Sequence, residues 1–191
     1  MATLLILLVI AAVVVLWIIG AYNGLIALKN QVANAWKQID VQLKRRHDLI
    51  PNLVNTVKGA MDFERSTLEA VISARNKAVN ATGVAQTAKA EGELTQALGR
   101  LFALTEAYPE LKATANVAQL QEELTSTENK IGFARQLYND TVTQYNTRQA
   151  TFPTMLVAGL AKATPAELWE ITDDTERAVP AVDLSSPKPA P

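Results

Sequence analysis

The chain has 191 residues, a formal net charge of −1 and no cysteine. This length allows one domain with a modest core and extra segments at the ends. The near-zero net charge does not point to nucleic acid as a partner, and the lack of cysteine excludes disulfides, thiolate nucleophiles and cysteine-ligated zinc in this chain. Glycine and proline are sparse, which favours helix over sheet.

The N-terminal stretch is apolar and carries no charged side chain before Lys29. Residues 2–22 are long enough to cross a bilayer core of about 30 Å as a helix, and Trp17 and Tyr22 suit its interfacial end. A cleaved signal peptide is the competing interpretation, but it requires a basic start, a shorter apolar run and a small-x-small cleavage site. We therefore expect residues 1–24 to form a retained single-pass transmembrane anchor.

The charges that flank this segment predict its orientation. Lys29 and Lys37 follow the apolar stretch, whereas only the α-amino group precedes it. Because positive charge favours the cytoplasmic side, we expect the C-terminal body in the cytoplasm.

Residues 25–151 are expected to form an elongated antiparallel four-helix bundle. Apolar residues recur at steps of three and four from Leu25 through Val71, and again in 84–107 and 111–149. Gly83 and Pro109 are expected helix terminators. Because such long helices are not stable alone in water, they must pack against one another. The predicted fold is all-α.

The stretch QLKRRHDLIPNLV, at 42–54, raises the question of where the first helix ends. Pro51 loses one helical hydrogen bond, and Asp48 stands three residues earlier, where it could cap a new helix. The apolar pattern continues across the stretch, so a kinked continuous helix is the alternative. We favour a helix break at Asp48 and Pro51, since it gives four segments of comparable length.

The C-terminal part divides into two segments. Residues 152–171 begin with an apolar patch, FPTMLVAGLA, too short to span a membrane. The following TPAELWEI predicts a short helix with Thr164 as cap and Pro165 at the first helical position. Residues 172–191 are polar and proline-rich, and are expected to be disordered.

Charged residues that fall within the apolar stripe are the candidate structural network. We expect them to pair between helices, because an unpaired buried charge costs several kcal/mol. Such pairs can fix helix register, or they can line a polar groove that binds a ligand. A buried tyrosine at the same face needs a partner for its hydroxyl. The candidates are Arg46, Glu64, Arg75, Glu128, Arg135 and Tyr138.

Nothing in the sequence predicts an active site. His47 and Asp48 are adjacent, and neighbours one apart on a helix do not face each other. The carboxylates of EGE at 91–93 and QEE at 121–123 lack the Glu-x-x-His spacing of a diiron bundle. We expect an exposed or turn-stabilising His47, no catalytic residue, and neither metal nor cofactor.

Three ordered motifs make the chain resemble the LemA family of bacterial membrane proteins. They are the stretch from AYNGLIALK to QLKRRHDLIPNLVNTVKG, then EAYPELKA, then LQEELTSTENKIGFARQLYNDTVTQYN followed by FP. The first part of the family's RR-x-DLIPNLV element, RR-x-DLIPN, maps onto residues 45–52, and the family's TEN…AR…YN element maps onto 127–139. Two features depart from the family pattern. KATANV at 112–117 is less rich in asparagine and aromatic residues than the family's usual start of this helix, and the family's C-terminal aromatic cluster is reduced to Trp169. The C-terminal patch is therefore expected to dock differently. The resemblance implies a membrane-anchored helical bundle and no particular reaction.

These observations lead to three functional hypotheses. The first is a non-enzymatic scaffold in the bacterial inner membrane that self-associates and docks to other membrane proteins or to the bilayer surface. The second is a binding module with a polar inter-helix pocket lined by Glu64, Arg75, Glu128 and Arg135. The third is an enzyme with carboxylate-based chemistry, which the missing motifs disfavour.

Overall fold

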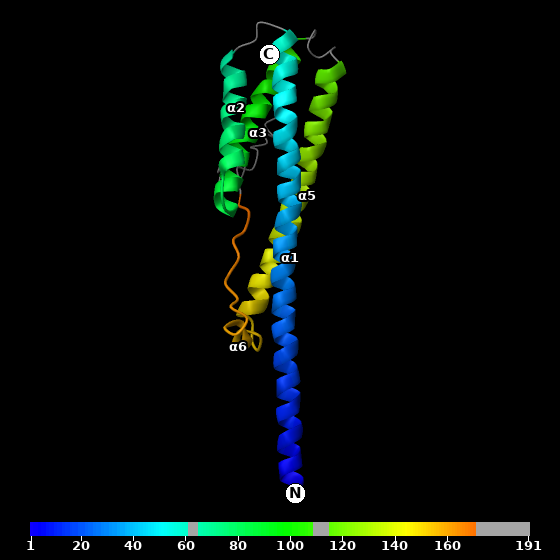
Figure 1. Ribbon diagram of the computed structural model, residues 1–191, viewed down its shortest axis with the longest axis vertical. Helices are drawn as coiled ribbons and strands as arrows, with labels where there is room; N and C mark the ends of the chain where they lie inside the picture. Colours follow the sequence, from blue (N-terminus) through cyan, green and yellow to red (C-terminus); the bar gives the residue numbers. More distant parts are fainter. Residues whose placement is uncertain (61–64, 109–114, 171–191) are drawn as a thin grey trace, which may run out of the picture.

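The predicted all-α fold is confirmed by a computed structural model, which describes residues 1–60, 65–108 and 115–170. Within these ranges the chain forms helices and no strand (Figure 1). The helices are α1 (Ala2–Ala60), α2 (Arg65–Asn80), α3 (Val84–Ala107), α5 (Ala115–Ala150) and α6 (Met155–Ala158). The predicted disordered tail at 172–191 lies outside the described residues.

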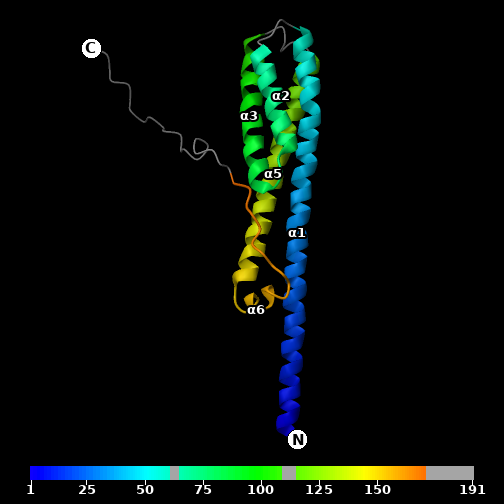
Figure 2. The same cartoon turned by 60° about the vertical axis from the view of Figure 1, so that its left-hand side comes forward.

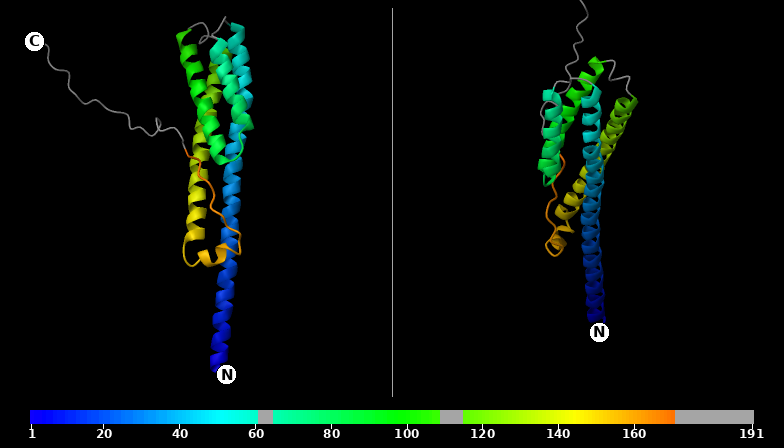
Figure 3. Two further views of the ribbon diagram at one scale, coloured as in Figure 1. Left: turned by 90° about the vertical axis from the view of Figure 1, so that its left-hand side faces the viewer. Right: turned by 45° about the horizontal axis from the view of Figure 1, so that its top comes forward.

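The helices form a rod that tapers toward the N-terminus. In its upper half α1, α2, α3 and α5 lie side by side with alternating directions, as a four-helix bundle does (Figures 1 and 2). Lower down only α1 and α5 continue together, and α6 closes the foot of this pair. Below α6, α1 extends alone (Figure 3). With 59 residues, α1 is about 88 Å long and therefore outreaches every partner.

The free part of α1 is the apolar N-terminal stretch. Its large apolar side chains are exposed, and none of the most apolar 18-residue window is buried against the body. Among the described residues, α1 is the one helix long and apolar enough to cross a membrane, judged by length and composition. Burial against the body begins at Ala21 and Leu25.

The expected helix break at Asp48 and Pro51 is wrong, because α1 continues through both residues to Ala60. Pro51 cannot donate to the carbonyl of His47 four residues earlier. That carbonyl is instead satisfied from α2, where Nε of Arg75 donates to it at 3.0 Å. Asp48 is exposed on the helix surface and caps nothing. A side chain from another helix thus replaces the backbone bond that proline removes.

The turn between α2 and α3 follows the sequence prediction. Helix α2 ends at Asn80, and Gly83 precedes α3 with a φ of 79°. This left-handed conformation suits glycine because it has no Cβ to clash with the backbone.

The interior of the rod consists of two apolar clusters along α1, with Arg46 between them. The upper cluster joins Ile50, Leu53 and Val57 of α1 to α2, α3 and the start of α5. The lower cluster joins Ile39 and Leu43 to the middle of α5 and to the C-terminal segment. Arg46 and the side chains that bind it, Glu91, Thr95 and Glu128, form a charged layer that separates these two apolar clusters.

The C-terminal segment also differs from the prediction. Residues 163–170 adopt no helix, so the short helix expected after Thr164 and Pro165 is wrong. The segment runs upward along α5 as an extended strap, seen in orange in Figure 3. Side chains of α5 bind the backbone N–H and C=O groups of Ala166 and Trp169, so these groups need no helix. Trp169 is 4% exposed and belongs to the lower core.

Candidate functional site

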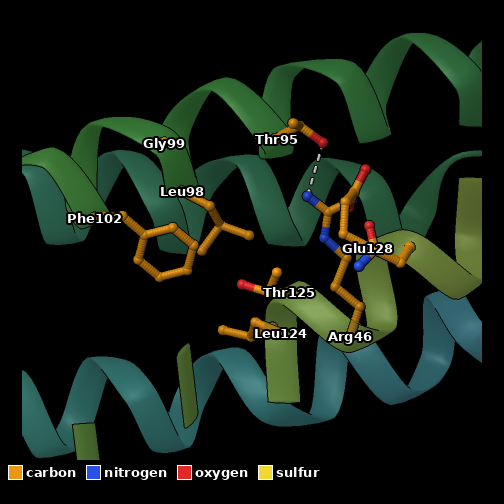
Figure 4. A pocket seen from close by; sticks show the side chains of 9 residues that line it. Arg46, Thr95, Leu98, Gly99, Phe102, Leu124, Thr125 and Glu128 are labelled. Atoms are coloured by element: carbon orange, nitrogen blue, oxygen red, sulfur yellow. Dashed lines mark hydrogen bonds and ion pairs between the residues drawn. The ribbon is translucent and has the colours of Figure 1, made fainter. Parts of the chain in front are cut away.

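A buried arginine lies at the centre of the charged layer. Arg46 on α1 is 3% exposed. Its Nη1 lies 2.8 Å from Oε2 of Glu128 on α5 and 3.3 Å from Oε2 of Glu91 on α3. Its Nη2 donates to Oγ1 of Thr95 on α3 at 2.8 Å (Figure 4). These contacts hold α1, α3 and α5 at one relative height, since sliding any helix would leave a charge unpaired.

His47 extends this layer and is not the exposed or turn-stabilising histidine expected from the sequence. Its side chain is 12% exposed, and Nε2 lies 2.6 Å from Oε1 of Glu91. Because an ionised carboxylate only accepts hydrogen bonds, His47 donates from Nε2. Glu91 thus receives Arg46 on one oxygen and His47 on the other.

The electrostatics of Arg46 reflect its position. Burial lowers the pKa of the Arg46 guanidinium below its ordinary value. The carboxylates of Glu128 and Glu91 act in the opposite direction, and the positive charge of Arg135 lowers the pKa further. The ordinary pKa of arginine is so high that the group stays charged at physiological pH. Its charge must therefore be balanced by the two glutamates.

The structure brings together some of the predicted network and separates the rest. Arg46, Glu128 and Arg135 form one chain of ion pairs, with Nη2 of Arg135 3.6 Å from Oε1 of Glu128. Arg75 contacts the backbone of His47 and not a carboxylate of this layer. Glu64 lies outside the described residues.

Tyr138 lies in the lower core, away from the ion pairs of Arg46. Its ring meets Trp36 edge-on at 5.5 Å, and its hydroxyl donates to the carbonyl of Glu167 at 2.8 Å. Burial, followed by the charge of Glu167, raises the pKa of this phenol above 10.0. The partner that this hydroxyl needs is thus a backbone oxygen of the strap.

Glu91 and Thr95 were missed by the sequence analysis. Glu91 is 2% exposed and lies three residues before Leu94. It continues the stripe of Leu94, Leu98 and Leu101 by one more step. The signal was thus the same helical spacing that pointed to Arg46 and Glu128.

A cavity opens beside the charged layer, between α3 and α5. It measures about 210 Å³. Leu98, Phe102 and Leu124 form much of its wall, with Arg46 and Glu128 at one end (Figure 4). The cavity therefore offers an apolar space with a polar end.

The second constellation is a pair of asparagines that bind the strap. Nδ2 of Asn139 donates to the carbonyl of Trp169 at 2.9 Å, and its Oδ1 accepts from the backbone N–H of Trp169 at 2.8 Å. Asn146 makes the same pair of bonds with Ala166, both at 2.9 Å. Each side-chain amide thus holds both polar backbone groups of one strap residue.

The aromatic anchor of the strap is Trp169. Its ring lies 5.9 Å from that of Trp36, and the guanidinium of Arg135 lies 5.8 Å from its centre. Arg135 therefore connects the charged layer, through Glu128, with the strap.

The described residues contain no group of three or more histidine, aspartate or glutamate side chains placed to hold a metal ion. The ion pairs and hydrogen bonds of the charged layer fix the register of α1, α3 and α5. The α1/α5 pair binds an extended backbone segment.

The sequence of this chain is similar to those of one known family. Residues 35–184 match the model of the LemA family. This chain belongs to the LemA family. It is 30% identical over 142 residues to Protein LemA of Metamycoplasma hominis, an alignment that covers 73% of this chain and 64% of that relative. The chain thus spans somewhat less than two thirds of that LemA protein. The family assignment carries with it no molecular activity.

Proposed function

We propose that this LemA family protein is a membrane-anchored, non-enzymatic scaffold that self-associates and binds other membrane proteins. The observation that carries the proposal is the continuity of α1. One helix begins as an exposed apolar stretch and continues as the longest element of the folded body. A single rigid element would therefore hold the body at a fixed distance from the bilayer.

The arrangement of the charges supports a structural role for the body. The donors of Arg46 are bound to Glu128, Glu91 and Thr95. His47 is bound to Glu91 as well. A general base or nucleophile needs access to substrate, whereas these groups are occupied by one another.

The site of action in this proposal is the bacterial inner membrane, with the body in the cytoplasm. Lys29 and Lys37 follow the apolar stretch, and the positive-inside tendency then favours this orientation. Protease digestion of sealed inverted vesicles tests it. We expect the body to be cleaved there and protected in right-side-out vesicles.

An exposed surface on the outer side of the α1/α5 pair is suited to protein contacts. Val41, Phe133 and Leu137 are 62%, 74% and 47% exposed, and they line one shallow groove with Lys37 and Lys130. Large apolar side chains grouped in this way on a surface are typical of interaction sites.

Chemical cross-linking in native membranes, followed by mass spectrometry, tests the scaffold proposal. We expect homo-oligomers and co-purifying membrane proteins at native expression levels. A chain that stays monomeric and without partners in native membranes would contradict the proposal.

The cavity beside Arg46 favours a second candidate, a ligand-binding module. Its volume of about 210 Å³ and its apolar wall fit a small amphipathic molecule whose polar group faces Glu128. A thermal-shift screen against small amphipathic metabolites tests it. Stabilisation that Leu98→Trp abolishes, because the indole fills the cavity, would support this candidate.

A further inference from the structure

The face of the α1/α5 pair that holds the strap, called here the α1/α5 groove, is a different surface from the shallow groove beside Val41 and Phe133. It consists of Trp36, Arg135, Tyr138, Asn139 and Asn146, and it binds mainly the backbone of the strap. Asn139 and Asn146 each contact a backbone N–H and a backbone C=O, and Tyr138 donates to a third carbonyl. Thr164, Pro165, Glu167 and Leu168 keep their side chains exposed. The groove therefore recognises an extended peptide with few demands on its side chains.

The spacing of the two asparagines matches an extended chain. Seven residues of α5 span about 10.5 Å along the helix axis. Three residues of extended chain, from Ala166 to Trp169, span about 9–10 Å. The side-chain amides of Asn139 and Asn146 are therefore spaced to bind two strap residues three positions apart. The strap runs antiparallel to α5.

Two strap residues supply the side-chain specificity. Ala166 is half-buried and small, and Trp169 is buried against Trp36 beneath the guanidinium of Arg135. The groove thus accepts a small residue followed, three positions later, by a large aromatic one. The peptide known to fit this pattern is residues 164–170 of the chain itself.

The connection to the strap is short and strained. Lys162 lies immediately before the strap with a φ of 47°, a left-handed conformation that is unfavourable for lysine. Its side chain is exposed, so burial of the side chain does not compensate for this conformation. A strained hinge before a docked segment favours exchange of that segment between two copies, since the open hinge can relax.

We infer that the α1/α5 groove is a binding site for residues 164–170 of a second copy, so that two chains associate by exchanging straps. The inference rests on the proposed membrane anchoring and self-association, and it names the surface through which two copies associate. Two copies anchored in one membrane carry strap and groove at the same height. The strap of one chain then meets the groove of its neighbour in the register that its own groove provides.

Photo-cross-linking in cells that co-express two tagged full-length forms tests the exchange. One form carries benzoylphenylalanine in place of Leu168, an exposed strap residue, and the other carries none. We expect a cross-linked product that contains both tags and that mass spectrometry maps to α1 or α5 of the unlabelled form. Absence of that product in wild type would overturn the inference.

Two substitutions at the hinge residue Lys162 should change the yield of the two-tag product in opposite directions, and substitutions at the strap contacts should abolish the product. Lys162→Gly relieves the strain of the closed form, so the two-tag product should fall severalfold. Lys162→Pro cannot adopt the closed φ, so the product should rise. Trp169→Ala should abolish the two-tag product, and so should the combination of Asn139→Ala with Asn146→Ala. Gln144→Ala is the control, because Gln144 is exposed on α5, and it should leave the yield unchanged. Equal yields from the glycine and proline variants would contradict an exchange through this hinge.

The same experiment separates this inference from the proposed function. If native-membrane cross-linking finds oligomers but no two-tag product forms through position 168, strap exchange is wrong and another surface mediates self-association. If no oligomer forms at all, both the exchange and the self-associating scaffold are wrong.

Discussion

Arg46 is the residue on which the packing of the upper and lower halves depends. It meets Glu91, which is 2% exposed, and Glu128. Replacing one member of a buried pair leaves the other as an uncompensated charge, at a cost of about 3–5 kcal/mol.

We therefore predict that Arg46→Leu lowers the free energy of unfolding by about 3–5 kcal/mol. Urea denaturation followed by circular dichroism measures this change. Adding Glu91→Leu should recover part of the loss, because the second buried charge is then gone. Arg65→Ala is the control, since its ion pair with Glu69 is highly exposed. An Arg46→Leu variant as stable as this control would show that the layer contributes little.

Tyr138 also contributes to the free energy of unfolding, and its contribution depends on pH. Its hydroxyl donates to the carbonyl of Glu167, so Tyr138→Phe should cost about 1 kcal/mol at neutral pH. The pKa of the phenol is raised in the folded state, so the folded chain holds this proton more tightly than the unfolded chain. Its stabilisation is fully present below the unfolded pKa of about 10 and is lost as pH rises through the folded pKa.

The measurement is the stability difference between wild type and Tyr138→Phe from pH 7 to pH 12. We expect a constant difference up to about pH 10, the ordinary tyrosine pKa, and a declining one above it. The subtraction removes the titration of the other groups. A difference that grows with pH would contradict the predicted sign.

At the scale of single elements, α1 contains a proline that should break it. The break is avoided because Arg75 donates to the carbonyl of His47, which the missing N–H of Pro51 leaves unpaired. If that is the reason, the two residues must be energetically coupled. Restoring an N–H at position 51 should make Arg75 less necessary.

A double-mutant cycle measures this coupling. Arg75→Ala alone should cost about 1–3 kcal/mol, since it leaves a carbonyl without its partner. In a Pro51→Ala background the same substitution should cost at least about 0.5 kcal/mol less, because residue 51 can then donate to His47. Additive losses in the cycle would mean that Arg75 stabilises the bundle in another way.

The same elements show how far sequence reasoning reaches. Helical spacing is a one-dimensional property. It predicted positions for Arg46, which is buried, and for Glu128 and Arg135, which are half-buried and joined to Arg46 by ion pairs. The break at Pro51 was wrong because its remedy comes from Arg75, 24 residues further on in another helix. The helix expected after Thr164 was wrong for a similar reason. Its local signals are overridden by Asn139 and Asn146, whose amides bind the strap backbone.

For the whole molecule, the structure predicts where anchor and body separate. None of the most apolar window of α1 is buried, whereas Ala21 is 9% and Leu25 is 1% exposed. Helix α6 contacts α1 at the foot of the body (Figure 1). The folding energy of the body should therefore be independent of residues 2–20 and should depend on the residues that follow.

Two deletions test this boundary. Removal of residues 2–20 should release the protein from the membrane fraction and leave the urea midpoint of the body nearly unchanged. Removal of residues 2–28 should also release it, but should lower the free energy of unfolding by about 2–3 kcal/mol, because Leu25 no longer fills the foot of the rod. Membrane fractionation and urea denaturation of both forms provide the measurements. If the shorter deletion stays with the membrane, a second surface of the body binds lipid. The apolar side chains of Phe152, Leu156 and Leu160, which are 65–72% exposed, would be the first to replace.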